Sequence, residues 1–579
     1  MSSSLRRPGR TPGTVNLAIA LGLLALLLPL VLHAATAAPP TAAEFSPNAR
    51  QVIKQAPPGQ APNVNGTGAT ATPTPTPTAG PHASATPSPR GSSVAENLVK
   101  PCVGPAPLRQ IEDPQSPPCI AYWQGDNGGA TSPGVTRDAI YVAVPTPNGF
   151  TQEYTAMQNF FNKRFTLYNR KIVLEFCSPK AGSGSQGSGG QQDQASDAAN
   201  AAAGCEGKPK PFASTFYQFD NGRYFDQEMA CRYKVVTVGS WEPYDKTFVN
   251  QCAPYFYNYP MVSQEMFGQL GEWSCDRLVG HKAAWAGDAA LRNGTRKFGV
   301  FLAPYTNDDP VARRSALAPL VDELRRCGAA VPEKQIIINP VTENSSAPGQ
   351  AVDPTSANNA IIQMKQSGVS SIFCLCGTFP FGALARAATT NGYHPEWIAS
   401  TFGNLDQVVI QELSAAPREQ ISHMFGLTFV PRQINPLLEP YNAAFQEGDP
   451  TLGAQTKSTD YSNYTQIYRP MLMLAAGLQM AGPHLTPETF RDGLRRAAFP
   501  NPVTAIHAGA VDVPSDGYTY THDAAEWWWN NNAKGPYSDD QARAKGAICY
   551  LDGGARRRDV WPRSVPAYFP TSGACDSGR

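Results

Sequence analysis

The chain has 579 residues, with 47 lysines and arginines against 46 aspartates and glutamates, and this length leaves room for about two to four domains with a sizeable core. Its near-zero net charge and the lack of any lysine and arginine cluster give no field for gripping nucleic acid or an anionic membrane surface. The 50 glycines without a period of three exclude collagen, and a single long apolar run excludes a multispanning membrane protein.

The first 38 residues have the layout of a secretory signal peptide. Three arginines among the first ten residues precede the apolar run Val15–Leu32, and Ala35-Thr36-Ala37 resembles a cleavage site. The run would extend about 27 Å as a helix, nearly the thickness of a bilayer core. We therefore expect either a cleaved signal peptide or an uncleaved membrane anchor, with the rest of the chain outside the cytoplasm in both cases.

Residues 39–94 form a segment of Pro, Thr, Ala, Gly and Ser that includes the alternating run Thr72–Thr78. Such a composition cannot bury enough apolar surface to order itself, so a disordered linker is expected. It would hold the following domains away from a membrane or wall. Residues 95–133 are expected to be an N-terminal extension tied by a disulfide.

The 12 cysteines of an exported chain predict disulfides, because an oxidising exterior lets them persist. Partners near in sequence are favoured: Cys102 with Cys119, Cys177 with Cys205, Cys231 with Cys252, and Cys549 with Cys575. Cys374 and Cys376 are expected to bridge to neighbours such as Cys275 or Cys327. No paired Cys-x-x-Cys or clustered histidines occur, so no metal site is predicted.

Strands and helices alternate through the body of the chain. Runs rich in β-branched and aromatic residues predict strands at Ala139–Val144, Ile172–Phe176, Val235–Val238, Lys297–Leu302, Gln335–Ile338, Ser371–Leu375, Trp397–Ser400 and Met424–Val430. Helices are predicted at Glu153–Asn169, Gln264–Cys275, Val311–Cys327, Asn358–Gln366 and Ala383–Thr390, the last three each followed closely by a glycine stop. This alternation predicts an α/β fold with parallel sheets, in two lobes because the length exceeds one comfortable core.

Ligands of parallel α/β sheets bind beyond the carboxyl ends of the strands, where loops lead into helices. The corresponding loops are rich in hydroxyl, amide and aromatic side chains: Pro145–Tyr154, Thr215–Asp220, Gly239–Asp245, Ala303–Asp309, Cys376–Phe381 and Thr401–Asp406. Hydrogen-bonding groups between aromatic walls suit recognition of a small polar molecule better than chemistry on one. No cofactor is predicted.

Several segments together resemble a known family. They are Gly134–Ala143, Lys234–Ser240, the strand–helix pair Phe298–Leu302 and Val311–Val331, and Gly377–Pro380 followed by Phe402–Asn404. In order and spacing they resemble the type I periplasmic-binding-protein fold, in particular the branched-chain amino-acid (Leu/Ile/Val)-type substrate-binding proteins of ABC transporters. The resemblance implies two Rossmann-like lobes with a hinge, residues 134–261 and 432–515 forming lobe 1, and residues 262–431 forming lobe 2 with a return and tail over 516–579.

The resemblance also implies a ligand site. From lobe 1 it implies Tyr154, Thr215, Ser240 and Glu242, and from lobe 2 it implies Tyr305, Phe379 and Thr401. Trp241 is also expected to line the cleft, from the lobe opposite Phe379. Where amino-acid binders present a carboxylate to the ligand ammonium, this chain has Thr401-Phe402-Gly403. An amino acid is therefore one candidate ligand, beside amides, short peptides, sugars and other polar metabolites.

The sequence thus predicts a non-enzymatic, extracytoplasmic solute-binding receptor working with an ABC permease or a membrane sensor. Two alternatives stay open. One is a secreted enzyme such as a hydrolase, for which His394 is the histidine nearest to a pocket loop. The other is a surface interaction module with a degenerate pocket.

Four further patterns have competing interpretations. Gly182–Gly187 matches a dinucleotide fingerprint but lies in the tract Ala181–Ala203, which favours a flexible loop. Asp308 and Asp309 favour a helix cap over paired catalytic carboxylates. In Trp527-Trp528-Trp529 one or two rings are expected in the core and the third covering a sheet edge, in preference to a sugar-stacking platform. The apolar segment Gln466–Met480 predicts a buried helix.

Overall fold

The structure is a computed structural model. It describes residues 99–145, 150–178, 191–215, 223–239, 243–303, 310–339, 352–401, 405–406, 415–434, 438–453, 461–500, 509–533, 546–570 and 575. These all belong to the unit Ser46–Arg579. Within these ranges, no helix is long and apolar enough to cross a membrane. The predicted signal segment 1–38 and the linker 39–94 lie outside the described residues.

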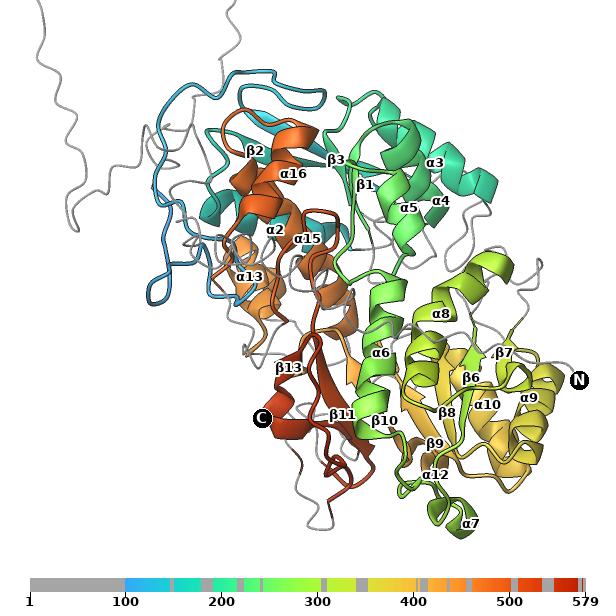
Figure 1. The fold of residues 1–579 in the computed structure, drawn as a ribbon. Coiled ribbons are helices and arrows are strands. Elements are labelled where there is room, and N and C mark those ends of the chain that lie inside the picture. The colour runs from blue at the N-terminus through green and yellow to red at the C-terminus, as the bar shows by residue number, and fades with distance from the viewer. Residues whose placement is uncertain are drawn as a thin grey trace, which may run out of the picture. The chain divides into compact units, whose positions relative to one another are not determined.

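The first sheet is parallel throughout its described strands, in the order β2-β1-β3-β4-β5. Its strands are β1 Ala139–Pro145, β2 Lys171–Cys177, β3 Ala213–Ser214, β4 Val236–Val238 and β5 Phe256–Tyr257. The accompanying helices are α2 Thr151–Arg164, α3 Gln191–Ala203, α4 Arg223–Gln227, η4 Glu228–Arg232, α5 Lys246–Gln251, α13 Pro440–Gly448, α14 Pro450–Gly453, α15 Tyr461–Ala481 and α16 Pro487–Arg496. We call this sheet with these helices the first lobe (Figure 1).

The second sheet has the order β12-β11-β10-β9-β8-β6-β7, with β13 paired to β11. Its strands are β6 Phe298–Leu302, β7 Ile336–Ile338, β8 Ser371–Leu375, β9 Glu396–Ala399, β10 Met424–Thr428, β11 Ala524–Asn530, β12 Ala547–Tyr550 and β13 Arg556–Arg557. The accompanying helices are α6 Ser263–Arg277, α7 Ala289–Arg292, α8 Pro310–Arg326, η5 Glu333–Gln335, α9 Pro354–Gln366, α10 Thr378–Thr390, α12 Arg418–Ile421 and η9 Leu551–Gly554. We call this the second lobe.

The two sheets repeat one topology. In each, the second strand in sequence lies at one edge, the first strand is next to it, and the third, fourth and fifth follow in order, all parallel. The second sheet then adds the antiparallel strands β11 and β12. The prediction of an α/β fold with two Rossmann-like sheets is confirmed, and this is the arrangement of the type I periplasmic-binding-protein fold.

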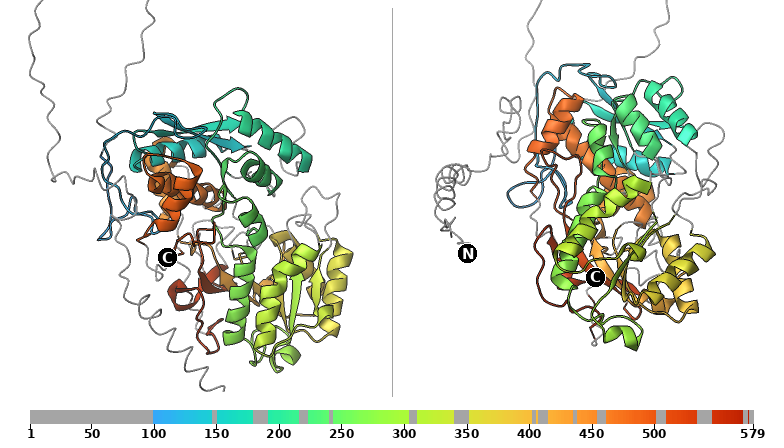
Figure 2. Two further views of the ribbon diagram at one scale, coloured as in Figure 1. Left: turned by 45° about the horizontal axis from the view of Figure 1, so that its top comes forward. Right: turned by 45° about the vertical axis from the view of Figure 1, so that its right-hand side comes forward.

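Both faces of the second sheet are buried. Apolar residues of α6 and α8 pack with one set of strand residues, among them Val300 and Phe373. Residues of α9 and α10 pack with the alternate set, among them Phe301 and Cys374. Since successive residues of a strand point to opposite faces, the two helix pairs cover opposite sides of the sheet, as Figure 2 also shows.

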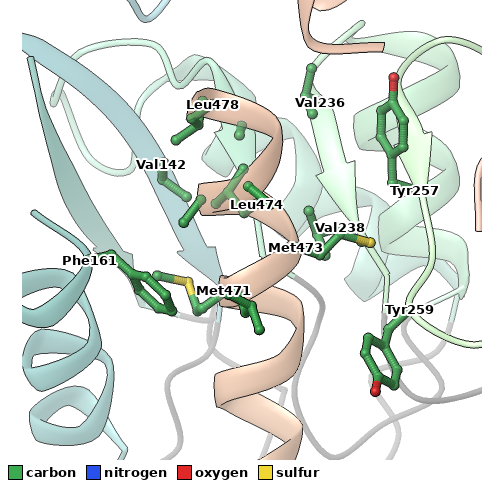
Figure 3. Packing of buried hydrophobic residues seen from close by; sticks show 14 of the residues in the cluster. Val142, Phe161, Val236, Val238, Tyr257, Tyr259, Met471, Met473, Leu474 and Leu478 are labelled. Atoms are coloured by element: carbon green, nitrogen blue, oxygen red, sulfur yellow. The ribbon is translucent and has the colours of Figure 1, made fainter. Parts of the chain in front are cut away.

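The long helix α15 is the centre of the first lobe's core. Its apolar residues are buried nearly all round, which confirms the buried helix predicted at Gln466–Met480. Figure 3 shows Met471 and Leu474 on the side of Val142 and Phe161, with Met473 on the side of Val238. A helix from late in the sequence thus packs against a sheet formed by residues from early in the sequence (Figure 1).

Within the described residues, the chain passes between the two hydrophobic cores three times. Tyr259 belongs to the first core and Met261 to the second; Phe429 belongs to the second and Val430 to the first; Tyr520 belongs to the first and Ala524 to the second. We call residues 258–261, 428–433 and 519–524 the crossing segments. Two of them pair, because Asn258 forms a parallel bridge with Thr519.

The predicted glycine stops are confirmed. Gly328, Gly368 and Gly392 have φ angles of +87°, +66° and +54°, the left-handed region that ends a helix at little cost for glycine. The helix expected to run to Asn169 ends earlier, at Arg164. Tyr168 and Asn169 themselves adopt positive φ angles of 57° and 64°, which a helix cannot continue through.

The four predicted disulfides Cys102–Cys119, Cys177–Cys205, Cys231–Cys252 and Cys549–Cys575 are present. The expectation that Cys374 and Cys376 bridge to Cys275 or Cys327 is wrong: Cys374 pairs with Cys376, and Cys275 with Cys327. Cys275 lies on α6 and Cys327 follows α8, whereas Cys374 and Cys376 pack in the core on the other side of the sheet. The sheet therefore separates the two pairs.

Two other expectations need correction. Trp527, Trp528 and Trp529 are all buried, because β11 is an inner strand between β10 and β12 and both its faces are covered. No ring is left as an edge cover or a sugar platform. The tract Ala181–Ala203 contains the helix α3 from Gln191, whose Ala198 and Ala201 pack into a small core. Gly182–Gly187, Asp308 and Asp309 lie outside the described residues.

Candidate functional site

Tyr154 and Thr215 lie at the carboxyl edge of the first sheet. Thr215 follows β3 directly, and its N–H donates to the carbonyl oxygen of Ala143 on the neighbouring strand β1 at 3.0 Å. Tyr154 is in the first turns of α2, the helix that follows β1. Both side chains are almost fully buried, at 0% and 1% exposure. The sheet topology thus brings two predicted contacts to one edge.

The hydroxyl groups of Tyr154 and Thr215 are among several buried polar atoms that lack a well-formed hydrogen bond with the described residues. The two hydroxyls lie close enough to act on each other as weak hydrogen-bond partners. Burial raises the pKa of Tyr154, and the nearby Thr215 hydroxyl offsets part of that rise, so the phenol stays neutral at physiological pH. A buried hydroxyl without a partner costs about 1–3 kcal/mol, and native proteins leave few of them. A polar ligand at this edge could form hydrogen bonds with both hydroxyls.

Thr401 lies at the matching edge of the second sheet, but its hydroxyl is occupied. It donates to Asp406 Oδ2 at 2.6 Å and accepts from the Phe429 N–H at 2.7 Å. Thr428, the last residue of β10, also donates to Asp406 Oδ2, at 2.5 Å. Thr401 therefore holds a carboxylate and a crossing segment in place.

Asp406 supplies a carboxylate near the position where the sequence seemed to lack one. Its Oδ1 atom is buried and has no hydrogen-bond partner among the described residues. Burial raises the pKa of this carboxyl group, while the donated hydrogen bonds from Thr401 and Thr428 and the charge of Arg556 act in the opposite direction. The second sheet thus carries, at its carboxyl edge, one acceptor oxygen with an unused hydrogen-bonding position.

Phe379 is the fourth predicted contact that the structure describes. It lies in the first turn of α10, the helix after β8, again at the carboxyl edge of the second sheet. Its side chain is 48% exposed, unusual for so large an apolar residue. Ser240, Trp241, Glu242 and Tyr305 lie outside the described residues.

The described residues contain no group of three or more metal-ligating side chains close enough to hold an ion. His394 is not a candidate general base for this site. It precedes β9, at the amino edge of the sheet, and its ring Nδ1 contacts Asp288 Oδ1 at 3.0 Å. The described groups at the carboxyl edges are hydroxyls, a carboxyl group and an aromatic ring.

Sequence reasoning missed Asp406 and Thr428. Asp406 stands in the loop Thr401–Asp406 that follows a predicted strand, so its location was available from the sequence. The family pattern matches Thr401, whereas the carboxyl group lies five residues later, at Asp406. For Thr428, the signal was its place at the end of a strand parallel to β9, which only the strand order reveals.

No protein-family model matches the chain, and no curated protein matches it. Solved structures resemble it in fold. A leucine-binding protein from Thermotoga maritima is 12% identical, with 68% of this chain and 95% of that chain covered and a TM-score of 0.44. A branched-chain amino-acid ABC transporter protein from Thermus thermophilus with bound valine is 11% identical, with coverage of 69% and 94% and a TM-score of 0.45.

A fatty acid ABC transporter substrate-binding protein from Thermomonospora curvata is also similar. It is 13% identical, with 76% of this chain and 100% of that chain covered and a TM-score of 0.45. Two of these three proteins are named for leucine or branched-chain amino acids and the third for fatty acids. Their similarity to this chain concerns the fold alone.

Proposed function

We propose that this chain is an extracytoplasmic solute-binding receptor that holds a small polar ligand at the carboxyl ends of the parallel strands of its two sheets. The observation that carries the proposal is the set of buried polar atoms without partners at these edges: Tyr154 Oη, Thr215 Oγ1 and Asp406 Oδ1. Leaving them unpaired costs free energy, which a ligand that pairs with them returns as affinity. The exposed ring of Phe379 adds an apolar wall.

The ligand class follows from this chemistry. Two hydroxyls both donate and accept, whereas a carboxyl oxygen that carries no proton only accepts. A molecule with its own donors, such as an amino acid, an amide or a related metabolite, meets that requirement. Ser240, Trp241, Glu242 and Tyr305 remain proposed contacts, and an ABC permease or a membrane sensor is the proposed partner of the closed form.

Capture would work by population shift. A ligand that touches both lobes favours the conformation in which the two edges approach each other, by the difference in its affinity for the two conformations. The crossing segments are the places where backbone angles change in such a motion. No covalent step is involved.

The test is a thermal-shift screen of the full chain, with its disulfides formed, against amino acids, amides, short peptides, sugars and nucleosides. A ligand present at about 100 times its Kd adds about 2.7 kcal/mol of stability, a shift of a few degrees for a chain of this size. A saturable shift establishes the receptor and names the ligand class. No shift across the panel contradicts the proposal and favours an interaction module, while a secreted enzyme would show turnover of a panel compound.

A further inference from the structure

The N-terminal extension contacts the crossing segments, which we call the hinge together with the side chains that tie them. Its residues Asp113 and Gln115 are fully buried although the extension precedes the first sheet in sequence. Asp113 Oδ2 accepts from Arg469 Nη1 at 2.6 Å and from the Tyr468 hydroxyl at 3.0 Å, both on α15. Its Oδ1 accepts from the Gln115 N–H at 2.7 Å. This carboxylate therefore fixes the backbone and the position of Gln115.

Gln115 uses every polar atom it has. Its Nε2 donates to the Gly509 carbonyl oxygen at 2.9 Å, and its Oε1 accepts from Arg469 Nη1 at 3.0 Å. Its Oε1 also accepts from the Tyr259 hydroxyl at 2.9 Å, and its backbone carbonyl accepts from the Tyr520 hydroxyl at 3.2 Å. Since Tyr259 and Tyr520 lie on two different crossing segments, one glutamine joins both.

The two tyrosines stand where those crossing segments leave the first lobe. The rings lie 6.2 Å apart, and the backbones pair through the Tyr520 N–H on Asn258 at 3.0 Å and the Thr521 N–H on Tyr259 at 3.1 Å. At the second-lobe side, Arg556 donates to the carbonyl oxygens of Phe429 and Val430 and pairs with Asp523 at 2.8 Å. The crossing segment 519–524 is thus held at both ends, through Tyr520 and through Asp523.

We infer that the extension is a positioning element of the hinge: Gln115, held by Asp113 and Arg469, fixes the first-lobe ends of two crossing segments and so sets the stiffness of the hinge. A fixed pivot lowers the entropy of the ligand-free protein and therefore the ordering cost of closure. The inference rests on the two-lobed architecture and not on the identity of the ligand.

The test uses the ligand-free full chain, so a failure of the ligand proposal leaves it intact. The double variant Tyr259→Phe/Tyr520→Phe removes the two hydroxyls from Gln115 and keeps both rings. The matched control is Tyr168→Phe, which removes a buried hydroxyl bonded to the Gln479 carbonyl oxygen within the first lobe. Spin labels on ketone-bearing residues at positions 334 and 488, which are exposed on the second and first lobes, avoid disturbing the paired cysteines.

We expect a broader inter-lobe distance distribution in the double variant than in the wild type and the control. We also expect about tenfold faster hydrogen exchange at the amides of Asn258, Tyr520 and Thr521 in the double variant. A distance distribution equal to that of the control would overturn the inference, even if stability falls, because a merely structural role lowers stability without freeing the hinge. If the double variant does not fold, Tyr259→Phe alone is measured in the same way.

Discussion

The hinge and the carboxyl edges of the sheets both bury polar groups, but they differ in whether those groups have partners. At the hinge, Asp113, Gln115 and Asp523 are each tied to named partners, and the Asp523–Arg556 pair has both side chains at 0% exposure. At the carboxyl edges, Tyr154, Thr215 and Asp406 are buried equally deeply and each has an atom without a partner. Burial alone therefore does not separate the hinge residues from the proposed binding residues in this chain.

The difference lies in what the folded chain gains from each group. Removing one partner of a buried ion pair leaves an uncompensated charge and lowers the stability of the fold. A buried hydroxyl without a partner already lowers stability, until a ligand pairs with it. Removing a group of the first kind should lower the stability of the protein. Removing a group of the second kind should weaken ligand binding, while stability stays the same or rises.

The largest effect is expected at the hinge. Arg556→Ala leaves Asp523 buried and unpaired, which should lower the free energy of unfolding by about 3–5 kcal/mol. Arg557→Ala is the matched control on the same strand, because Arg557 makes only a 3.7 Å contact with the half-exposed Asp552. There we expect about 0–1 kcal/mol. Denaturant unfolding measures both, and similar losses for the two would refute the assignment of Arg556 to the hinge.

A buried carboxyl group of the first lobe, Asp226, should make the stability of the protein depend on pH. Burial raises the pKa of Asp226 to about 8, and only the Tyr244 hydroxyl, 2.6 Å from its Oδ2, acts against that rise. Because this pKa is above the unfolded value near 4, the stability that Asp226 contributes is present at low pH and is lost as pH rises toward 8.

Asp226→Asn keeps the neutral form at all pH values. In the wild type, the free energy of unfolding should fall by up to about 4 kcal/mol between pH 5 and pH 8 because of Asp226. In the variant this fall should be absent. Chemical denaturation at several pH values gives the slope. An unchanged pH slope in the variant would mean that Asp226 is ionised and solvated in the folded chain.

At the carboxyl edge of the first sheet, we expect a smaller effect, and one that raises the free energy of unfolding. Tyr154→Phe/Thr215→Val removes both unpartnered hydroxyls with little change of shape. Without ligand, the free energy of unfolding should stay constant or rise by about 1 kcal/mol. Tyr168→Phe, which removes a partnered hydroxyl of the same lobe, should lower it by a similar amount. A loss in the double variant as large as in the control would show that the edge hydroxyls are structural.

The smallest stability effect is expected at Phe379. Its side chain is 48% exposed, so Phe379→Ala should change the free energy of unfolding by no more than about 0.5 kcal/mol. The thermal shift produced by a ligand from the screen should nevertheless largely disappear, because the aromatic wall is lost. A retained shift would remove Phe379 from the site.

The sequence predicted the fold well where local chemistry decides it. Apolar runs such as Ser371–Leu375 appear as the strand β8 with the same bounds, and glycines such as Gly328 stop helices as expected. Short strands such as Ala213–Ser214 were missed, since two residues carry too little pattern. Trp527–Trp529 was misjudged because the burial of β11 depends on β12, which pairs with it from later in the chain.

The site was only partly predictable for a related reason. Tyr154 and Thr215 could be anticipated from their places after strands, but the occupied hydroxyl of Thr401 and the partner-free oxygen of Asp406 depend on side-chain packing. The hinge network could not be anticipated at all. Gln115 contacts Gly509 across 394 residues of sequence, a separation over which no local pattern carries information.

The most direct test of the carboxyl-edge site is a calorimetric titration of the screen's ligand into the wild type, Tyr154→Phe/Thr215→Val and Tyr168→Phe. The account predicts binding at least about tenfold weaker in the double variant, a loss of about 1.4 kcal/mol or more, and wild-type affinity in the control. Wild-type affinity in the double variant would contradict the central claim that the unpartnered groups at the carboxyl edges form the ligand site.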